Sequence, residues 1–171
     1  MNGKFKEFTD KIYILKALTR YNNKFKIISE SVAEHSFFVA IFVLKLYEEY
    51  EFNLETALSM GLVHDIPELH LSDITHDVKR NFPKIKEAVL DAERVVMNKI
   101  YPKWSNLFDK LEDDENSVEA LIVKLADNLS CVQYANAELG LGNSGYMKEV
   151  FNNSSERVKK IEEKLENYRR K

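Results

Sequence analysis

A histidine and an aspartate stand side by side at the end of an apolar run, as His64 and Asp65. They offer one nitrogen and one oxygen donor, a mixed set that suits Zn, Mn, Fe or Co. Pro67 disfavours helical geometry at Ile66, so the helix that carries the pair is predicted to stop or kink there. At a helix end two successive side chains can converge on one point, and Glu68 could reach it too. The dipeptide alone is weak evidence, so its meaning depends on further ligands elsewhere in the chain.

Hydrophobic periodicity predicts which elements hold this pair. Of the 171 residues only five are glycine and three are proline, and these lie between the periodic segments, which favours long helices. Two stretches are expected to be irregular, a run of turn-forming residues at 69–80 and an acidic loop at 109–116. The chain is therefore predicted to be an all-α, single-domain helical bundle of about six or more helices, spanning residues 1–171. The helices are expected over residues 5–20, 32–50, 54–65, 83–101, 117–139 and, as a charged last helix, about 146–171.

Two more polar residues fall on faces that should be buried. His35 lies on the apolar stripe of the second helix, four residues before Val39, and Asp127 interrupts the most apolar helix of the chain. An unpaired carboxylate in a core costs several kcal/mol, so Asp127 must be paired, hydrogen-bonded or bound to a cation. With His64 and Asp65, these residues could form a divalent metal site that leaves room for water and substrate. Each residue alone is more often part of a buried polar network, and spacing leaves both interpretations open.

Composition excludes several classes of function. The net charge of −3 gives no basic field for a nucleic-acid polymer, and no run approaches the ~18 apolar residues of a membrane span. The first residues lack the apolar core of a signal peptide. The single cysteine, Cys131, excludes an internal disulfide, fits a reducing compartment and is expected to be a core residue. A cytoplasmic globular protein is expected.

The order His, His-Asp, Asp on helices is the signature of the HD-domain metal-dependent phosphohydrolases, and the chain resembles them. The likeness extends to the YfbR-like 5′-deoxynucleotidases and covers roughly residues 15–145. The motifs are in the family's order and near its spacings, and their combination is specific although each fragment is not. They are Arg20-Tyr21, Glu30-Ser31-Val32-Ala33-Glu34-His35-Ser36, His64-Asp65 with Glu68 and Asp73, Val78-Lys79, and Val123-Lys124-Leu125-Ala126-Asp127.

The resemblance implies a role for each matched residue. Glu68 would be the acid/base residue beside the attacking water, and Asp73 would contact the sugar 3′-hydroxyl or help the proton transfer. Arg20 would bind the phosphate, with Lys79 as a further substrate-binding candidate. The implied ligands of a divalent transition metal (Mn, Co, Fe, Ni or Zn) are His35, His64, Asp65 and Asp127.

One position departs from the family pattern. A tryptophan follows the phosphate-binding arginine in the family and crowds the sugar 2′ position, which favours deoxyribose. The residue here is Tyr21, so the resemblance leaves the deoxyribose and base preferences open.

The leading hypothesis is a 5′-nucleotidase that hydrolyses (deoxy)nucleoside 5′-monophosphates to nucleoside and orthophosphate, with a metal-activated water as nucleophile. A rival is a dNTP triphosphohydrolase on the same fold, whose pocket would need several cations, such as Lys79, Arg80 and Lys124. A third hypothesis is a catalytically inactive helical binding module. Such a module would lack one of the metal-binding residues or Glu68, and the sequence contains all of them. The resemblance also implies a homodimer or higher homo-oligomer.

Overall fold

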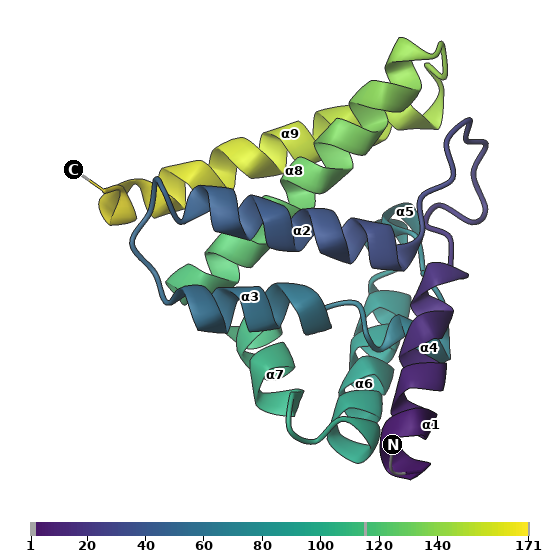
Figure 1. The fold of residues 1–171 in the computed structure, drawn as a ribbon. Coiled ribbons are helices and arrows are strands. Elements are labelled where there is room, and N and C mark those ends of the chain that lie inside the picture. Colours follow the sequence, from purple (N-terminus) through teal and green to yellow (C-terminus); the bar gives the residue numbers. More distant parts are fainter. Residues whose placement is uncertain (1–2, 115, 171) are drawn as a thin grey trace.

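The computed structural model describes residues 3–114 and 116–170, and over these ranges the chain is helical, with β-pairing limited to isolated bridges. This confirms the predicted all-α class and single helical domain (Figure 1). None of the described helices is both long and apolar enough to cross a membrane. The α-helices are α1 (Gly3–Ile12), α2 (Val32–Leu46), α3 (Leu54–Val63), α4 (Glu68–Leu71), α5 (His76–Asn81), α6 (Pro83–Ile100), α7 (Ser105–Asp113), α8 (Val118–Gly140) and α9 (Tyr146–Leu165).

The longest helix, α8, is the centre of the fold. It contacts α2, α3, α7 and α9, and Figure 1 shows it crossing α2 while α9 runs along it. The main core forms where these helices meet, and its fully buried side chains include Val39, Val43, Met60, Leu125 and Leu165. Burial of each such side chain contributes about 1.5–3 kcal/mol, so α2, α3 and α8 form a firm frame for the side chains on their inner faces.

Side-chain caps fix where two of these helices begin. Ser31 caps α2 in a capping box: its hydroxyl accepts from the Glu34 N–H at 3.2 Å, and Glu34 accepts from the Ser31 N–H at 2.7 Å. Asn53 caps α3 by accepting from the Thr56 N–H. The start of α2 sets the register of His35, and α3 ends one residue before His64, close to the predicted end.

The structure corrects two expectations of irregular chain. Residues 69–80 include most of α4 and most of α5. The expected acidic loop at 109–116 is helical through Asp113, because α7 buries Phe108 and Leu111 against the core. Packing of this apolar edge outweighs the acidic composition of the segment.

The expected first helix is also shorter than predicted. The α-helix ends at Ile12 and a 3-10 turn continues to Lys16. The chain then pairs with the segment before α2, since Arg20 N–H donates to the Glu30 carbonyl at 2.9 Å and Val32 N–H donates to the Leu18 carbonyl at 2.9 Å. This pairing replaces helical hydrogen bonds and brings Arg20 beside the start of α2.

Candidate metal centre and active site

The end of α3 presents His64 and Asp65 together. Beyond Val63 the chain turns tightly, with the Ile66 N–H donating to the Val63 carbonyl at 3.1 Å. His64 Nδ1 lies 2.7 Å from the Gly61 carbonyl oxygen, which accepts its proton. This hydrogen bond fixes the ring orientation and directs Nε2 toward the inside of the bundle.

The predicted metal-binding residues from α2, the end of α3 and α8 converge. Donor atoms of His35, His64 and Asp127 all lie within 4.8 Å of one another. His35 Nε2 is 3.0 Å from Asp127 Oδ1 and 3.7 Å from Asp65 Oδ2. Asp65 falls outside the tightest group of three, yet its Oδ2 lies 3.0 Å from His64 Nε2. The four residues therefore border one small volume.

Their buried nitrogens fit a divalent cation. The Nε2 atoms of His35 and His64 are buried and lack aligned hydrogen-bond partners among the described residues, although carboxylate oxygens lie 3.0 Å away. Two unsatisfied imidazole nitrogens are costly in a core, whereas a cation bound between them and two carboxylates satisfies all four groups. The donor set of two nitrogens and two oxygens suits a transition metal rather than calcium.

Electrostatics differ between the two histidines. Burial and the Arg20 guanidinium lower the pKa of His35 to about 4, so its ring is neutral at pH 7. Burial opposes protonation of His64 as well, but the neighbouring Asp65 carboxylate outweighs burial and raises the pKa of His64 to about 9. Without a metal, His64 therefore carries a proton that a cation must displace.

Arg20 lies directly behind the histidine of α2. Its Nη1 is 2.7 Å from His35 Nδ1 and donates to Glu30 Oε2 at 3.2 Å, while its Nη2 donates to Cys131 Sγ at 3.4 Å. Ser130 Oγ also lies 3.0 Å from His35 Nδ1. Arg20 and Glu30 are both largely buried, so this guanidinium is held in one place beside the cluster.

Glu68 and Asp73 border the same cavity as Arg20. Glu68 Oε2 is buried without a hydrogen-bond partner, and burial together with the Asp65 and Asp73 carboxylates raises its pKa well above the usual range. Asp73 Oδ2 accepts from the Tyr21 N–H at 2.8 Å. Both Tyr21, with φ 52°, and Ser72, with φ 62°, adopt backbone conformations that side-chain-bearing residues rarely take. This backbone strain is concentrated where Arg20 and Asp73 approach each other.

Tyr21 is a wall of the site rather than a mobile side chain. Its ring stacks on Tyr134 at 5.3 Å between centroids with an interplanar angle of 8°, and Tyr146 meets its edge at 6.2 Å. The side chain is buried, with 6% of its surface exposed. It also forms part of the lining of the pocket described next.

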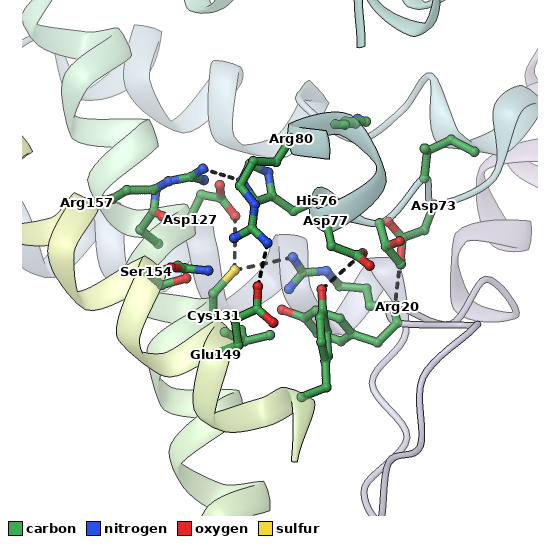
Figure 2. A pocket seen from close by; sticks show the side chains of 18 of the residues that line it. Arg20, Asp73, His76, Asp77, Arg80, Asp127, Cys131, Glu149, Ser154 and Arg157 are labelled. Carbon is green, nitrogen blue, oxygen red and sulfur yellow. Dashed lines mark hydrogen bonds and ion pairs between the residues drawn. The ribbon is translucent and has the colours of Figure 1, made fainter. Parts of the chain in front are cut away.

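A cavity of about 180 Å³ opens from this cluster toward α5 and α9. Figure 2 shows Arg20 and Asp73 on one side of it, and Arg157 with His76 on another. Lys79 lines the cavity and is 3.3 Å from Glu93 Oε1. The predicted site residues in its lining are Arg20, Tyr21, Asp65, Glu68, Asp73, Lys79 and Asp127, while His35 and His64 lie outside the lining.

Several lining residues were not predicted for this site because their partners are far away in sequence, and Arg80 was considered only for a triphosphate pocket. Arg80 of α5 pairs with Glu149 of α9 at 2.5 Å, and His76 contacts Arg157. Cys131 is buried as expected, but it also lines the cavity, one turn after a predicted ligand. That spacing was the one available signal.

The family model "5′-deoxynucleotidase YfbR-like" matches residues 7–169. The chain belongs to the YfbR-like 5′-deoxynucleotidase family. It is thus a phosphohydrolase of this family, with a site of side chains able to hold a metal. Among curated proteins, no sequence matches it.

Solved structures agree with the family fold. The PH0347 protein from Pyrococcus horikoshii OT3 is 29% identical, with a TM-score of 0.79 over 95% of this chain and 94% of that one. A conserved hypothetical protein from Pyrococcus furiosus is 27% identical, with a TM-score of 0.77 over 93% and 95% of the two chains. An HD-domain phosphohydrolase from Listeria innocua is 18% identical, with a TM-score of 0.74 over 94% and 82%, and shares the fold.

Proposed function

We propose that this protein is a metal-dependent 5′-nucleotidase that hydrolyses deoxynucleoside 5′-monophosphates to nucleoside and orthophosphate. The observation that carries the proposal is the cluster of His35, His64, Asp65 and Asp127 beside the buried guanidinium of Arg20. A cation supplies positive charge for the phosphate and acidifies water. Membership of the family supports the reaction class and the deoxynucleotide substrate.

Arg20 binds the phosphate in this proposal. Its planar guanidinium can hold two phosphate oxygens, and the carboxylate of Glu30, 3.2 Å from Arg20 Nη1, orients it. Lys79 reinforces the positive charge along the same cavity. The charges of Arg20 and Lys79 attract the phosphate only locally, since the net charge of −3 gives no long-range attraction for a phosphate dianion.

Glu68 and Asp73 provide the proton chemistry. The raised pKa of Glu68 suits a carboxyl group that exchanges protons near neutral pH, and its buried, unpartnered oxygen is free to face a reacting group. Asp73 is fixed by the Tyr21 N–H and faces the sugar, where it contacts the 3′-hydroxyl or assists proton transfer. Tyr21 forms the adjoining wall and sets the space at the 2′ position.

A structural neighbour supports a nucleotide ligand and a transition metal. The cyanophage S-2L HD phosphohydrolase DatZ, "bound to dA and one catalytic Zn2+ ion", has a TM-score of 0.71 over 92% of this chain and 91% of that one. It is 18% identical to this chain, so its ligands indicate which classes of substrate and metal to test here. We propose that this chain takes Mn, Co, Fe, Ni or Zn.

A second candidate function is hydrolysis of deoxynucleoside triphosphates with release of triphosphate. The observation that favours it is the presence of Arg80 and Arg157 in the cavity lining, in addition to Lys79. Each of them already has a partner: Arg80 pairs with Glu149, Arg157 contacts His76 and Lys79 pairs with Glu93. A longer phosphate tail would have to displace these partners. Lys124, also considered a triphosphate ligand, is absent from this lining.

The products of hydrolysis test both functions. The purified protein is loaded with Mn²⁺ or Co²⁺, incubated with dAMP, AMP and dATP, and its products are resolved. Orthophosphate from dAMP, lost in the Glu68→Ala and Asp127→Ala proteins, is the expected result. Triphosphate from dATP with untouched dAMP would replace the first function by the second.

We also propose that the protein is a cytoplasmic homo-oligomer. Large apolar side chains are exposed on its surface, among them Tyr13, Phe25 and Phe37, which supports association. Light scattering at several concentrations measures the mass directly, and a monomer mass throughout would refute the proposal.

A further inference from the structure

A second cavity, of about 580 Å³, lies between α2, α8 and the segment before α2. Its walls are mostly apolar and include Ile28, Phe38, Ile41 and Tyr134. None of its lining residues belongs to the lining of the first cavity, beside Arg20 and Asp127, which we call the nucleotide cavity. A hollow of this size matches small-molecule sites, which usually occupy about 300–1,000 Å³.

The charged groups of this cavity are all acidic. Glu30 and Glu34 line it, and its lining contains no lysine, arginine or histidine. Glu34 is exposed, and its carboxylate accepts hydrogen bonds from the Ser31 hydroxyl and backbone N–H, both at 2.7 Å. The cavity therefore combines an apolar wall with a negative rim, which favours a cation and disfavours an anion.

Three of its lining residues support the candidate active site from behind. Glu30 pairs with Arg20, and Ser130 Oγ contacts His35 Nδ1. Tyr134 stacks on Tyr21. A ligand in this cavity thus touches the direct partners of the phosphate-binding, metal-binding and sugar-wall candidates.

We propose that this cavity, which we call the rear groove, is a binding site for a small amphiphilic cation with an apolar body and a protonated amine. The apolar body packs against Phe38 and Ile41, and the amine lies at the carboxylates of Glu30 and Glu34. Because the amine partly screens Glu30, occupancy alters the pairing of Glu30 with Arg20 and hence substrate affinity. The rear groove is an effector site coupled to the nucleotide cavity.

Three compounds with the same apolar body test the chemistry: 4-phenylbutylamine, 4-phenylbutan-1-ol and 4-phenylbutyrate, titrated calorimetrically into the full chain. The amine is expected to bind with a Kd on the order of 1 mM or tighter, which suits its size. The alcohol is expected to bind more weakly and the carboxylate not at all. Equal binding of all three, or of none, overturns the proposal.

Variants locate the binding. Ala137 lines the rear groove but has an exposed side chain, so Ala137→Trp fills the cavity without disturbing the core and is expected to abolish binding. Leu44 is exposed on the same α2 and lies outside the lining, so Leu44→Ala is the matched control and is expected to bind normally. Unchanged binding by Ala137→Trp overturns the location.

Glu34→Gln tests the charge separately. Glutamine preserves the capping box of α2, so the fold of the helix start is retained. Binding of the amine is expected to weaken about threefold, as for an exposed ion pair, while binding of the alcohol stays the same. An equal effect on both compounds contradicts a role for the charge.

The coupling has its own readout. In the metal-loaded enzyme, saturating amine is expected to change the KM for dAMP at least about twofold and to leave kcat nearly unchanged, as a modest allosteric coupling would. Ala137→Trp, which keeps basal activity, is expected to lose this response. Binding without any change in KM refutes the coupling. Absence of nucleotide hydrolysis would count against the proposed function alone, because the calorimetric test needs no turnover.

Discussion

The guanidinium of Arg20 lies 2.7 Å from Nδ1 of His35, so the candidate phosphate-binding group contacts a candidate metal ligand directly. Ser130 Oγ, at 3.0 Å, is the second neighbour of the same nitrogen. A metal on Nε2 requires the proton of a neutral ring to sit on Nδ1, where Ser130 can accept it and Arg20 cannot. Metal binding and the position of Arg20 are thus expected to depend on each other.

Replacing Arg20 with lysine tests its role in phosphate binding. Lysine keeps the charge but loses the planar fork, and loss of one charge-assisted hydrogen bond to phosphate is expected to raise the KM for dAMP about tenfold or more. Steady-state kinetics measure this change, and metal content by elemental analysis shows whether the cluster is intact. Arg94→Lys, at a half-buried arginine of α6 outside the cavity lining, serves as the control. An unchanged KM would remove Arg20 from the phosphate site.

Loss of a candidate metal-binding carboxylate is expected to have a thermal signature. Asp127→Asn retains the size of the side chain but weakens metal binding, so added Mn²⁺ is expected to raise the Tm of the parent protein and to leave the variant's Tm nearly unchanged. At 100 times Kd the metal contributes about 2.7 kcal/mol to the parent protein. Asp10→Asn on the exposed face of α1 is the matched control and should respond like the parent. Equal metal shifts in parent and Asp127→Asn would mean that the cation binds elsewhere.

The pH dependence of metal binding follows from the shifted histidine. With the pKa of His64 raised to about 9 by Asp65, despite burial, a bound cation must displace a proton below that pH. Metal affinity is therefore expected to rise between pH 6 and pH 8, at most about tenfold per pH unit for one displaced proton. Calorimetric titration in two buffers of different ionisation enthalpy measures the proton released. Affinity that is flat with pH and releases no proton would contradict a metal at His64.

The buried carboxyl of Glu68 makes a separate prediction for the metal-free protein. Its folded-state pKa is raised by burial and by Asp65 and Asp73, so the folded protein binds this proton more tightly than the unfolded chain does. Its contribution to stability is complete below the ordinary carboxyl pKa and is lost as pH rises toward the folded value. Glu68→Gln is thus expected to raise the Tm by about 3 °C or more at pH 8, and by less at pH 5. Thermal unfolding with a chelator present measures both values.

An exposed acid provides the control for that experiment. Glu55→Gln, in the first turn of α3, removes the same charge at the protein surface. It is expected to change the Tm little and by similar amounts at the two pH values. A gain for Glu68→Gln that is equal at pH 5 and pH 8 would show that its carboxyl has no raised pKa in the folded protein.

Sequence patterns predicted the helices that hold the candidate metal-binding residues because these helices carry local signals. Ser31 and Asn53 mark helix starts, and Asp127 is conspicuous because it interrupts an apolar stripe. The short helices α4 and α5 were missed, since segments of four and six residues show no full amphipathic repeat.

The outer wall of the cavity was also beyond sequence reasoning. Arg157, in a helix interpreted as a charged surface, contacts His76, which lies 81 residues earlier in the chain. Glu30 was visible as part of a motif, but its contact with Arg20 depends on the backbone pairing that ended the first helix early. Long-range contacts of this kind are set by packing, and local periodicity carries no record of them.

Sugar selectivity tests the position where the chain departs from the family pattern. Tyr21 is held between Tyr134 and Tyr146, so its ring cannot swing away from a ribose 2′-hydroxyl. Tyr21→Ala is expected to raise kcat/KM for AMP relative to dAMP about tenfold, in the range of one removed steric contact. The ratio of the two substrates is the readout, because the change also removes a buried ring and lowers stability by about 3–5 kcal/mol. Tyr50→Ala removes a buried ring of the main core outside the cavity lining and is the control, for which the ratio should stay near that of the parent. An unchanged ratio in Tyr21→Ala would place the 2′ discrimination elsewhere in the cavity.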